Sequence, residues 1–286
     1  MEFLQPEDWN EALEARAAHP GAMPLWGGTD VMVDLNFGRA RPEAILDLTR
    51  VRELEEWGPA HPERDGVLRV GAGVSYTRAI DELGGVLPGL AAASRTVGSP
   101  QIRNRGTIGG NLGSSSPAGD ALPPLYASNA EIEVESSARG TRRVPIGEFI
   151  TGPKRNVLEP DELIAAFHIA PASGPQQFSK VGTRNAMVIA VCSFALALHP
   201  DERRVGTCIG SAGPTPITAT DAEAFANEML DWNDGTTPSD ADLARFGELV
   251  AQAASPIDDV RGSAAYRRHA LGVLARRTLA WAWSER

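Results

Sequence analysis

The amino-acid sequence predicts an α+β protein with a domain boundary near residue 173. Three observations support this prediction. Short apolar runs of strand length occur in both halves of the chain, polar residues stand at helix-capping positions before amphipathic segments, and residues 171–175 (Pro-Ala-Ser-Gly-Pro) have the composition of a linker. A chain of 286 residues is long enough for two domains that each bury a core.

The N-terminal part begins with a helix that the sequence delimits at both ends. Asp8 and Glu11 have the spacing of a capping box, and His-Pro-Gly at residues 19–21 ends the segment. After this helix we expect an apolar approach at 23–26 to a glycine turn at 27–30, and a short buried strand at 44–48. An internal strand at 67–73 and a helix that Ser75 caps and that Gly-Gly at 84–85 ends should follow.

A long glycine- and serine-rich segment occupies the middle of the chain, at residues 98–124. Strand signals follow at 131–135 and 163–169, with a turn between them at 151–154 (Thr-Gly-Pro-Lys). Polar residues alternate along both strands, which predicts a sheet with one solvent-facing side.

Beyond the linker the pattern predicts two strands followed by three helices. The strands cover residues 188–198 and 205–212, and the helices begin at Thr220 (spaced from Glu223 as in a capping box), at Ser239 and at Ser263. The last helix carries four arginines that we expect to form a solvated face, with docking on an acidic partner as the alternative: Arg267, Arg268, Arg276 and Arg277.

The composition excludes several classes of protein. The chain has 27 Lys+Arg against 37 Asp+Glu, for a net charge of −10, and shows no basic stripe that could follow a nucleic-acid backbone. The start of the chain lacks the pattern of a signal peptide, and the most apolar run, at 187–198, is too short to insert in a membrane. We therefore expect a soluble, cytoplasmic protein.

The cysteine and histidine content argues against a metal centre in this chain. Cys192 and Cys208 do not form a Cys-x-x-Cys pair, and the five histidines are scattered without metal-ligand spacing. We expect two buried structural thiols. Any redox role must then use an organic cofactor or the metals of a partner.

Two glycine-containing loops are the strongest candidates for a binding site. The first covers residues 26–31 (Trp-Gly-Gly-Thr-Asp-Val), and the second covers 106–111 (Gly-Thr-Ile-Gly-Gly-Asn) and continues to Asp120. Neither loop matches a P-loop or a Rossmann fingerprint. Paired glycines with Thr, Asn and Ser indicate a pyrophosphate held by backbone and hydroxyl donors. The alternatives are a plain turn for the first loop, a solvated linker for the second, and a helix cap for Asp120 in place of an acceptor for ribityl or ribose hydroxyls.

Seven motifs occur together and in one order along the chain. They are Gly-Gly-Thr-Asp at 27–30, Gln-Ile-Arg-Asn-Arg-Gly-Thr-Ile-Gly-Gly-Asn at 101–111, Ser116 and Pro117 with Asp120, Pro-Asp-Glu-Leu-Ile at 160–164, Lys-Val-Gly at 180–182, Gly-Pro-Thr-Pro at 213–216, and Asp-Val-Arg-Gly-Ser-Ala-Ala-Tyr-Arg-Arg at 259–268. With these motifs the sequence resembles the FAD-binding (medium) subunits of the molybdenum hydroxylases, the family of xanthine dehydrogenase and carbon monoxide dehydrogenase.

The resemblance implies an FAD-binding fold of two α+β subdomains, similar to the PCMH and vanillyl-alcohol oxidase type, and a smaller α+β C-terminal domain. The FAD-binding domain would cover residues 1–172, with subdomains at about 1–56 and 57–172, and the C-terminal domain would be of the carbon monoxide dehydrogenase flavoprotein type at 176–284. At the position of Trp26 the family usually has a small residue, and at Val188 relatives often have an acidic one, so this chain departs from the pattern at both positions.

The resemblance also implies which residues bind FAD. The pyrophosphate and adenosine side would contact Pro24, Leu25, Trp26, Gly27, Gly28, Thr29, Asp30 and Val31. The second diphosphate loop would contain Thr107, Ile108, Gly109, Gly110 and Asn111; Ser114 and Asp120 would bond the ribityl or ribose region; Ile164 would pack on the ring system; and Lys180 would lie near the polar edge of the flavin. Without the resemblance to this family, the sequence would predict that Ile164 is a core strand residue and that Lys180 is a surface lysine.

The implied activity is electron transfer within a cytoplasmic heterotrimer. A molybdopterin large subunit would oxidise a purine such as xanthine, an iron–sulfur small subunit with [2Fe–2S] clusters would pass the electrons to FAD, and NAD⁺ would accept them. No side chain here is expected to be catalytic, and no metal is expected in this chain. One alternative is the medium subunit of a carbon monoxide or N-heterocycle dehydrogenase that donates to a quinone or cytochrome. Another is a non-catalytic assembly subunit that has lost FAD.

Overall fold

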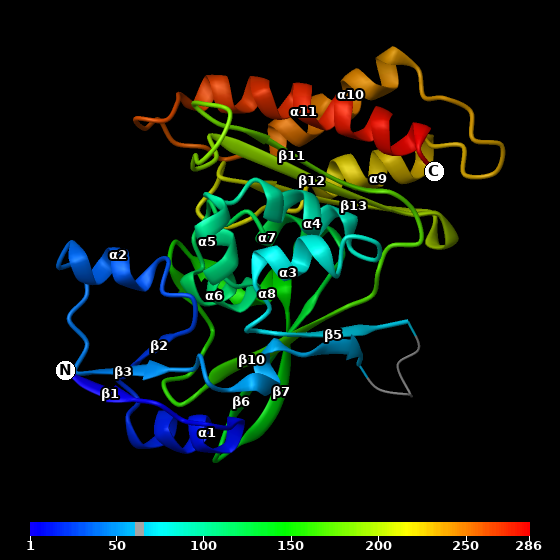
Figure 1. The fold of residues 1–286 in the computed structure, drawn as a ribbon. Coiled ribbons are helices and arrows are strands. Elements are labelled where there is room, and N and C mark those ends of the chain that lie inside the picture. The colour runs from blue at the N-terminus through cyan, green and yellow to red at the C-terminus, as the bar shows by residue number, and fades with distance from the viewer. Residues whose placement is uncertain (61–65) are drawn as a thin grey trace.

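A computed structural model gives the structure of residues 1–60 and 66–286. Figure 1 shows three stacked parts: a small N-terminal sheet, a central sheet covered by short helices, and a C-terminal sheet under three longer helices. None of the helices in the described residues combines the length and the apolarity that crossing a bilayer requires. The mixture of helices and strands confirms the α+β class.

The N-terminal part is a three-stranded parallel sheet in the order β1-β3-β2, with two helices beside it. Its elements are β1 (Glu2–Leu4), α1 (Trp9–Ala18), β2 (Met23–Leu25), α2 (Val31–Asn36) and β3 (Ala44–Asp47). Helix α1 begins as predicted, because the Asp8 side chain accepts a hydrogen bond from the Glu11 amide at 2.9 Å. All four residues of β3 are buried, which confirms the short buried strand.

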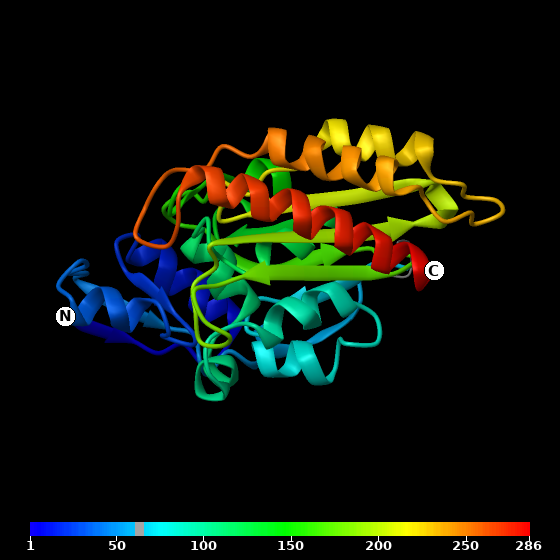
Figure 2. The ribbon, with the colours of Figure 1, turned by 90° about the horizontal axis from the view of Figure 1, so that it is seen from above.

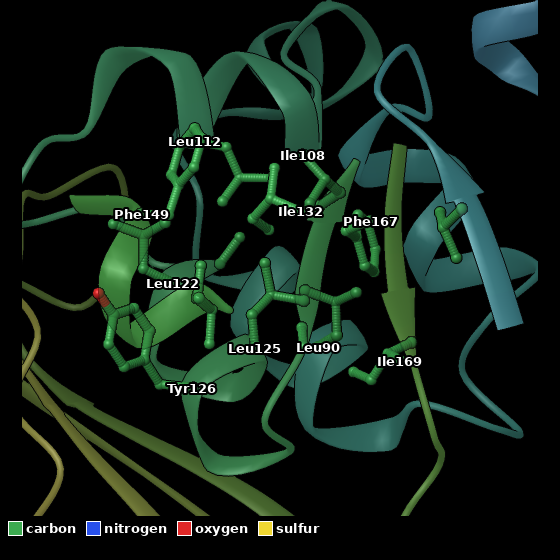
Figure 3. Packing of buried hydrophobic residues seen from close by; sticks show 14 of the residues in the cluster. Leu90, Ile108, Leu112, Leu122, Leu125, Tyr126, Ile132, Phe149, Phe167 and Ile169 are labelled. Carbon is green, nitrogen blue, oxygen red and sulfur yellow. The ribbon is translucent and has the colours of Figure 1, made fainter. Parts of the chain in front are cut away.

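The central part is a five-stranded antiparallel sheet in the order β4-β5-β10-β6-β7. Its elements are the 3₁₀ helix η1 (Arg52–Glu55), β4 (Trp57–Pro59), β5 (Leu68–Gly71), α3 (Tyr76–Asp81), α4 (Pro88–Arg95), α5 (Pro100–Arg105), α6 (Ile108–Ser114), α7 (Leu122–Ala127), β6 (Glu131–Ser136), β7 (Gly140–Pro145), α8 (Ile146–Phe149), the hairpin β8 (Ile150–Gly152) and β9 (Arg155–Asn156), and β10 (Leu163–Ile169). Figure 3 shows the core between the sheet and the helices, where Leu112, Leu125 and Phe149 meet Ile132 and Phe167.

The solvent-facing side predicted for β6 and β10 is wrong. Glu133 and His168 are both buried, and Glu133 accepts hydrogen bonds from Arg69 on β5 and is bonded to His168 Nε2. Helix α1 covers this face, and its Trp9 indole donates to the Glu135 carboxylate at 3.0 Å. The alternating polar residues therefore mark an internal ion pair network and not a wet surface.

The glycine- and serine-rich segment contains regular structure that its composition did not reveal. It includes all of α5 and α6, and Thr107 caps α6 by accepting a hydrogen bond from the Gly110 amide at 2.9 Å. Asp120 is not a helix cap, because α7 begins after Ala121 without a side-chain cap. The solvated-linker alternative is therefore wrong, and these short helices are held by tertiary packing.

The C-terminal part is an antiparallel sheet in the order β11-β12-β13, buried between two layers of helices. Its elements are β11 (Gln176–Val181), β12 (Cys192–His199), the 3₁₀ helix η2 (Pro200–Glu202), β13 (Arg204–Gly210), α9 (Thr220–Met229), α10 (Asp240–Ala253) and α11 (Ala264–Ser284). Figure 2 shows α11 running along one face of this sheet, and α4 and α7 of the central part pack on the other.

Small residues allow the central helices to approach this sheet closely. On β12, Phe194 and Leu196 face the outer helices, whereas Ala195 and Ala197 face α7. A Cβ atom on Gly206 would lie 1.9 Å from the Ala127 carbonyl oxygen, so this position of β13 accepts only glycine. Because both faces are covered, every residue of β12 is buried.

Two expectations about the C-terminal helices are wrong. Thr220 does not cap α9; Glu223 instead accepts hydrogen bonds from the Thr207 amide and hydroxyl at 2.6 and 2.9 Å. Arg267 is not on a solvated face but is 1% exposed, and its guanidinium donates to the Ser211 carbonyl oxygen and the Asp259 carboxylate. The other three arginines of α11 are exposed as expected.

Candidate functional site

The two glycine loops are in direct backbone contact. A Cβ atom on Gly27 would lie 2.0 Å from the Arg105 carbonyl oxygen and 3.0 Å from Gly106 Cα, so a side chain at position 27 would separate the loops. On their other side the Ser114 hydroxyl donates to Asp30 Oδ2 at 2.7 Å. The fold thus brings together two segments that are about eighty residues apart in sequence.

The backbone amides of the first loop are available for a ligand. Within the described residues, no acceptor is bonded to the N–H groups of Gly27, Gly28, Thr29 and Asp30. Gly28 has φ +72, a left-handed conformation that glycine adopts without strain. Successive unpaired amides at such a turn form a binding site for an anion such as a diphosphate.

The amides of residues 108–111 in the second loop are already bonded within the protein, which corrects the expectation that these amides are offered to a ligand. The acceptors are Val74 O for Ile108, Ala72 O for Gly109, Thr107 Oγ1 for Gly110 and Thr107 O for Asn111, at 2.9–3.1 Å. A Cβ atom on Gly109 would lie 2.4 Å from Ala72 Cβ, so this glycine serves close packing against β5. The second loop therefore shapes the site and contributes side chains.

A cavity of about 400 Å³ opens beside the loops. Four residues predicted for the site line it: Thr29, Asp30, Asn111 and Asp120. Its further lining, which the sequence reasoning missed, consists of Tyr76, Val97, Gly98, Ser99, Ile102, Ser116, Ala118, Gly119, Met187, Val188 and Ile189. Val188 and Ile189 were expected to begin a strand, but β12 starts only at Cys192, and with Met187 they instead line the cavity from the C-terminal part.

Lys180 and Asp120 form a buried ion pair at this cavity. Lys180 Nζ lies 2.6 Å from Asp120 Oδ2, and their side chains are 6% and 9% exposed. Burial raises the pKa of Asp120, and the Lys180 ammonium opposes this rise. The second oxygen, Asp120 Oδ1, is buried without a hydrogen-bond partner among the described residues, and such an unpaired buried acceptor is rare in folded proteins. The surface-lysine alternative for Lys180 is wrong.

Trp26 and Ile164 lie behind the loops and not in the cavity lining. The Trp26 ring packs on Gly73, where a Cβ atom would lie 2.8 Å from Cζ2 of the indole. Trp26 and Ile164 are both half-buried against the N-terminal core, and Ile164 Cδ1 lies 3.7 Å from a Cβ position on Gly113 of α6. Trp26 therefore fills the space that Gly73 leaves open.

Three further predicted residues lie outside the cavity lining. Pro24 and Leu25 belong to β2, and Val31 begins α2. The structure does not bring these three residues to the cavity.

Cys192 and Cys208 are free and buried, as expected, and burial raises the pKa of the Cys192 thiol to about 12. The described residues contain no group of His, Cys, Asp and Glu side chains that could hold a metal ion.

Family models match nearly the whole chain. Residues 1–172 match the "FAD binding domain in molybdopterin dehydrogenase", and residues 177–282 match the "CO dehydrogenase flavoprotein C-terminal domain". The chain belongs to the FAD-binding subunits of the molybdenum hydroxylase family. It is thus the component of an oxidoreductase that binds FAD, and members of this family work with molybdopterin and iron–sulfur centres on partner subunits.

Similar proteins of this family act in several different oxidations. The chain is 32% identical over 279 residues to the putative xanthine dehydrogenase FAD-binding subunit of Escherichia coli K12, covering 94% of this chain and 91% of that protein. It is 31% identical over 226 residues to the nicotinate dehydrogenase FAD-subunit of Eubacterium barkeri, covering 73% of this chain and 75% of that protein.

Solved structures share the fold of this molybdenum hydroxylase subunit. Quinoline 2-oxidoreductase from Pseudomonas putida contains a chain that matches with a TM-score of 0.88 at 23% identity, over 99% of this chain and 97% of that chain. A chain of reconstituted CO dehydrogenase from Oligotropha carboxidovorans matches with a TM-score of 0.89 at 24% identity, over 100% and 98%. At these identities the likeness confirms the fold alone.

Proposed function

We propose that the paired glycine loops and the adjoining cavity hold FAD. The first loop binds its diphosphate through the amides of residues 27–30, and Asp120 Oδ1 accepts a hydrogen bond from a hydroxyl of the ribityl chain or ribose. The residues fit this cofactor, because the free amides suit an anion and the unpaired buried oxygen suits a hydroxyl group. Ser114, Asn111 and Lys180 hold these groups in place.

The FAD-binding domain in this proposal covers residues 1–172, with subdomains at about 1–56 and 57–172, and residues 176–284 form the C-terminal domain. The division is supported by three hydrophobic clusters, of which one lies mainly in each subdomain and one in the C-terminal part. Lys180, Met187, Val188 and Ile189 reach the cavity from the C-terminal domain, so both domains contribute to the site.

The chain, in this proposal, carries electrons from the [2Fe–2S] clusters of an iron–sulfur small subunit to NAD⁺, after a molybdopterin large subunit has oxidised a purine such as xanthine. Bound FAD supplies the chemistry that joins one-electron clusters to a two-electron acceptor. The residues of this chain bind and orient the cofactor. The 32% identity to a xanthine dehydrogenase subunit across 94% of the chain supports the purine substrate. In this proposal the complex is a cytoplasmic heterotrimer, a location that is consistent with NAD⁺ as the electron acceptor.

The observation that carries the proposal is the contact between a loop with four unpaired amides and a cavity with an unpaired carboxylate oxygen. The test is to purify the chain with its co-expressed partner subunits and record its absorption spectrum and its reduction of NAD⁺ with xanthine. We expect flavin bands and xanthine-dependent NADH formation. Absence of flavin bands after reconstitution with FAD would contradict the cofactor assignment and favour the non-catalytic assembly subunit.

An N-heterocycle or carbon monoxide dehydrogenase is the second candidate function. The nicotinate dehydrogenase FAD-subunit is 31% identical, and the nicotine 6-hydroxylase medium subunit of Paenarthrobacter nicotinovorans is 29% identical over 98% of this chain. In this case the acceptor is a quinone or cytochrome. Reduction of a quinone analogue with nicotinate, quinoline or CO, without reduction of NAD⁺ by xanthine, would favour this candidate over the first.

A further inference from the structure

The hydroxyl group of Tyr76 is an unused hydrogen-bond donor at the cofactor cavity. Tyr76 begins α3, is 5% exposed and lines the cavity of about 400 Å³. Its hydroxyl makes no hydrogen bond within the described residues. The hydroxyl oxygen is also not one of the fully buried polar atoms without a partner, so part of its surface is accessible. The hydroxyl therefore reaches the cavity, and only a ligand or water there can pair with it.

Tyr76 lies at the junction of the two glycine loops. Its amide donates to the Gly106 carbonyl oxygen at 3.0 Å, and a Cβ atom on Gly106 would lie 3.0 Å from Tyr76 Cε2. Gly106 Cα in turn lies 3.0 Å from a Cβ position on Gly27. The phenol ring is thus packed behind the point where the first loop, with its free amides, meets the second.

The surroundings of Tyr76 keep its hydroxyl protonated. Burial raises the pKa of Tyr76, and the carboxylates of Asp120 and Asp30 raise it further. A protonated phenol donates a hydrogen bond, and an anionic oxygen is the strongest acceptor for it. The diphosphate assigned to this junction offers such oxygens.

We propose that the Tyr76 hydroxyl is an FAD-binding group that donates a hydrogen bond to an oxygen of the diphosphate. This inference rests on the proposed function. Asp120 then accepts from a ligand hydroxyl while Tyr76 donates to a phosphate, so the two side chains recognise different parts of one cofactor. Tyr76 carries no pattern in the sequence beyond its position after the cap Ser75, so the sequence predicts only that it lies in a helix.

The test compares Tyr76→Phe with Tyr126→Phe in the full chain. Tyr126 is a matched control because it is 6% exposed in the same core but does not line the cavity; Figure 3 shows it at the edge of that core. Dissociation constants are measured for FAD, for ADP, which carries the adenosine and the diphosphate without the flavin, and for riboflavin, which carries no phosphate. The free energy of unfolding is measured without ligand.

We expect Tyr76→Phe to raise the Kd for FAD and for ADP by about tenfold or more, the effect of losing a hydrogen bond to a charged group. The Kd for riboflavin and the unfolding free energy should not change, because the hydroxyl has no partner inside the protein. Tyr126→Phe should leave all three constants within about twofold of wild type, since its ring is retained and its hydroxyl is remote from the ligand.

Three results would overturn the inference. FAD binding by Tyr76→Phe at wild-type affinity excludes the hydrogen bond, an equal loss for riboflavin excludes the phosphate as its acceptor, and a loss of stability or of folding shows a structural role. If the wild-type chain and Tyr76→Phe bind ADP and FAD equally well, the Tyr76 assignment fails and the proposed function is unaffected. If the wild-type chain binds neither, the proposed function fails, and the Tyr76 inference fails with it.

Discussion

Lys180 Nζ lies 2.6 Å from Asp120 Oδ2, and this contact joins the C-terminal sheet to the cavity beside the glycine loops. Lys180 is on β11, and Asp120 precedes α7, so the pair crosses between the two domains. Lys180 also donates to the Thr96 carbonyl oxygen at 3.2 Å. A buried ammonium with two oxygen partners fixes the position of the Asp120 carboxylate.

The Lys180→Met substitution should destabilise the chain by about 3 kcal/mol, because it leaves the Asp120 carboxylate buried without its cation. Burial already raises the pKa of Asp120. Without Lys180 this rise should be larger, so the loss should be greater at pH 8 than at pH 5. Urea unfolding of the wild-type and variant chains at both pH values measures this loss of stability.

Adding Asp120→Asn to Lys180→Met should recover part of the lost stability, because no buried charge then remains. If the loss in the double variant equals the sum of the losses in the two single variants, the two residues do not interact. Lys154→Met is the control: Lys154 is 63% exposed in its pair with Asp34, so its loss should change stability by no more than about 0.5 kcal/mol.

Gly27→Ala should separate the two glycine loops, because the new Cβ would lie 2.0 Å from the Arg105 carbonyl oxygen. We expect a destabilisation of about 1–3 kcal/mol and at least a tenfold rise in the Kd for FAD, measured by flavin fluorescence. Gly21→Ala introduces the same methyl group where nothing lies within 4 Å, and it should leave both quantities unchanged. Wild-type FAD affinity in Gly27→Ala would contradict the loop assignment.

The stability of the central sheet should depend on acid through Glu133. Burial raises the pKa of Glu133, but hydrogen bonds from His168 and Arg69 outweigh burial and lower it from the ordinary 4.5 to about 2. Because the pKa is lower in the folded state, the stabilisation is present above about pH 4.5 and is lost as the pH falls towards 2.

Glu133→Gln should therefore lower the unfolding free energy by about 3 kcal/mol at pH 7 and by much less near pH 2. Chemical denaturation across this pH range is the measurement. Glu148→Gln, on an exposed residue of the same domain, should follow the wild-type pH profile. A Glu133→Gln profile parallel to wild type would show that this carboxylate is not the titrating group.

Two neighbouring arginines of α11 should respond differently to the same substitution. Arg267→Met removes the buried donor to the Ser211 carbonyl oxygen and to Asp259, so we expect a loss of about 3 kcal/mol. Arg268 is exposed, and Arg268→Met should change stability by less than about 0.5 kcal/mol. Similar thermal unfolding of the two variants would contradict the buried role of Arg267.

Features that depend on a few consecutive residues could be predicted from the sequence. Asp8, Ser75, Ser239 and Ser263 each cap the helix assigned to them, because a capping bond spans only three residues. Thr220 fails the same rule since Glu223, its partner in the motif, pairs with Thr207 on the neighbouring strand. A local pattern predicts correctly only where no distant group competes for the same side chain.

The sequence by itself determined the α+β class, the two glycine loops and, through its motifs, the family of FAD-binding subunits. The tertiary structure decided which groups of those loops are free: within the described residues the amides of residues 27–30 are unpaired, whereas those of residues 108–111 donate to Ala72, Val74 and Thr107. It also decided that Lys180 and Arg267 are buried and that Tyr76 reaches the cavity. The physical reason is that burial and pairing depend on residues far apart in the chain, which only the packed fold brings within bonding distance.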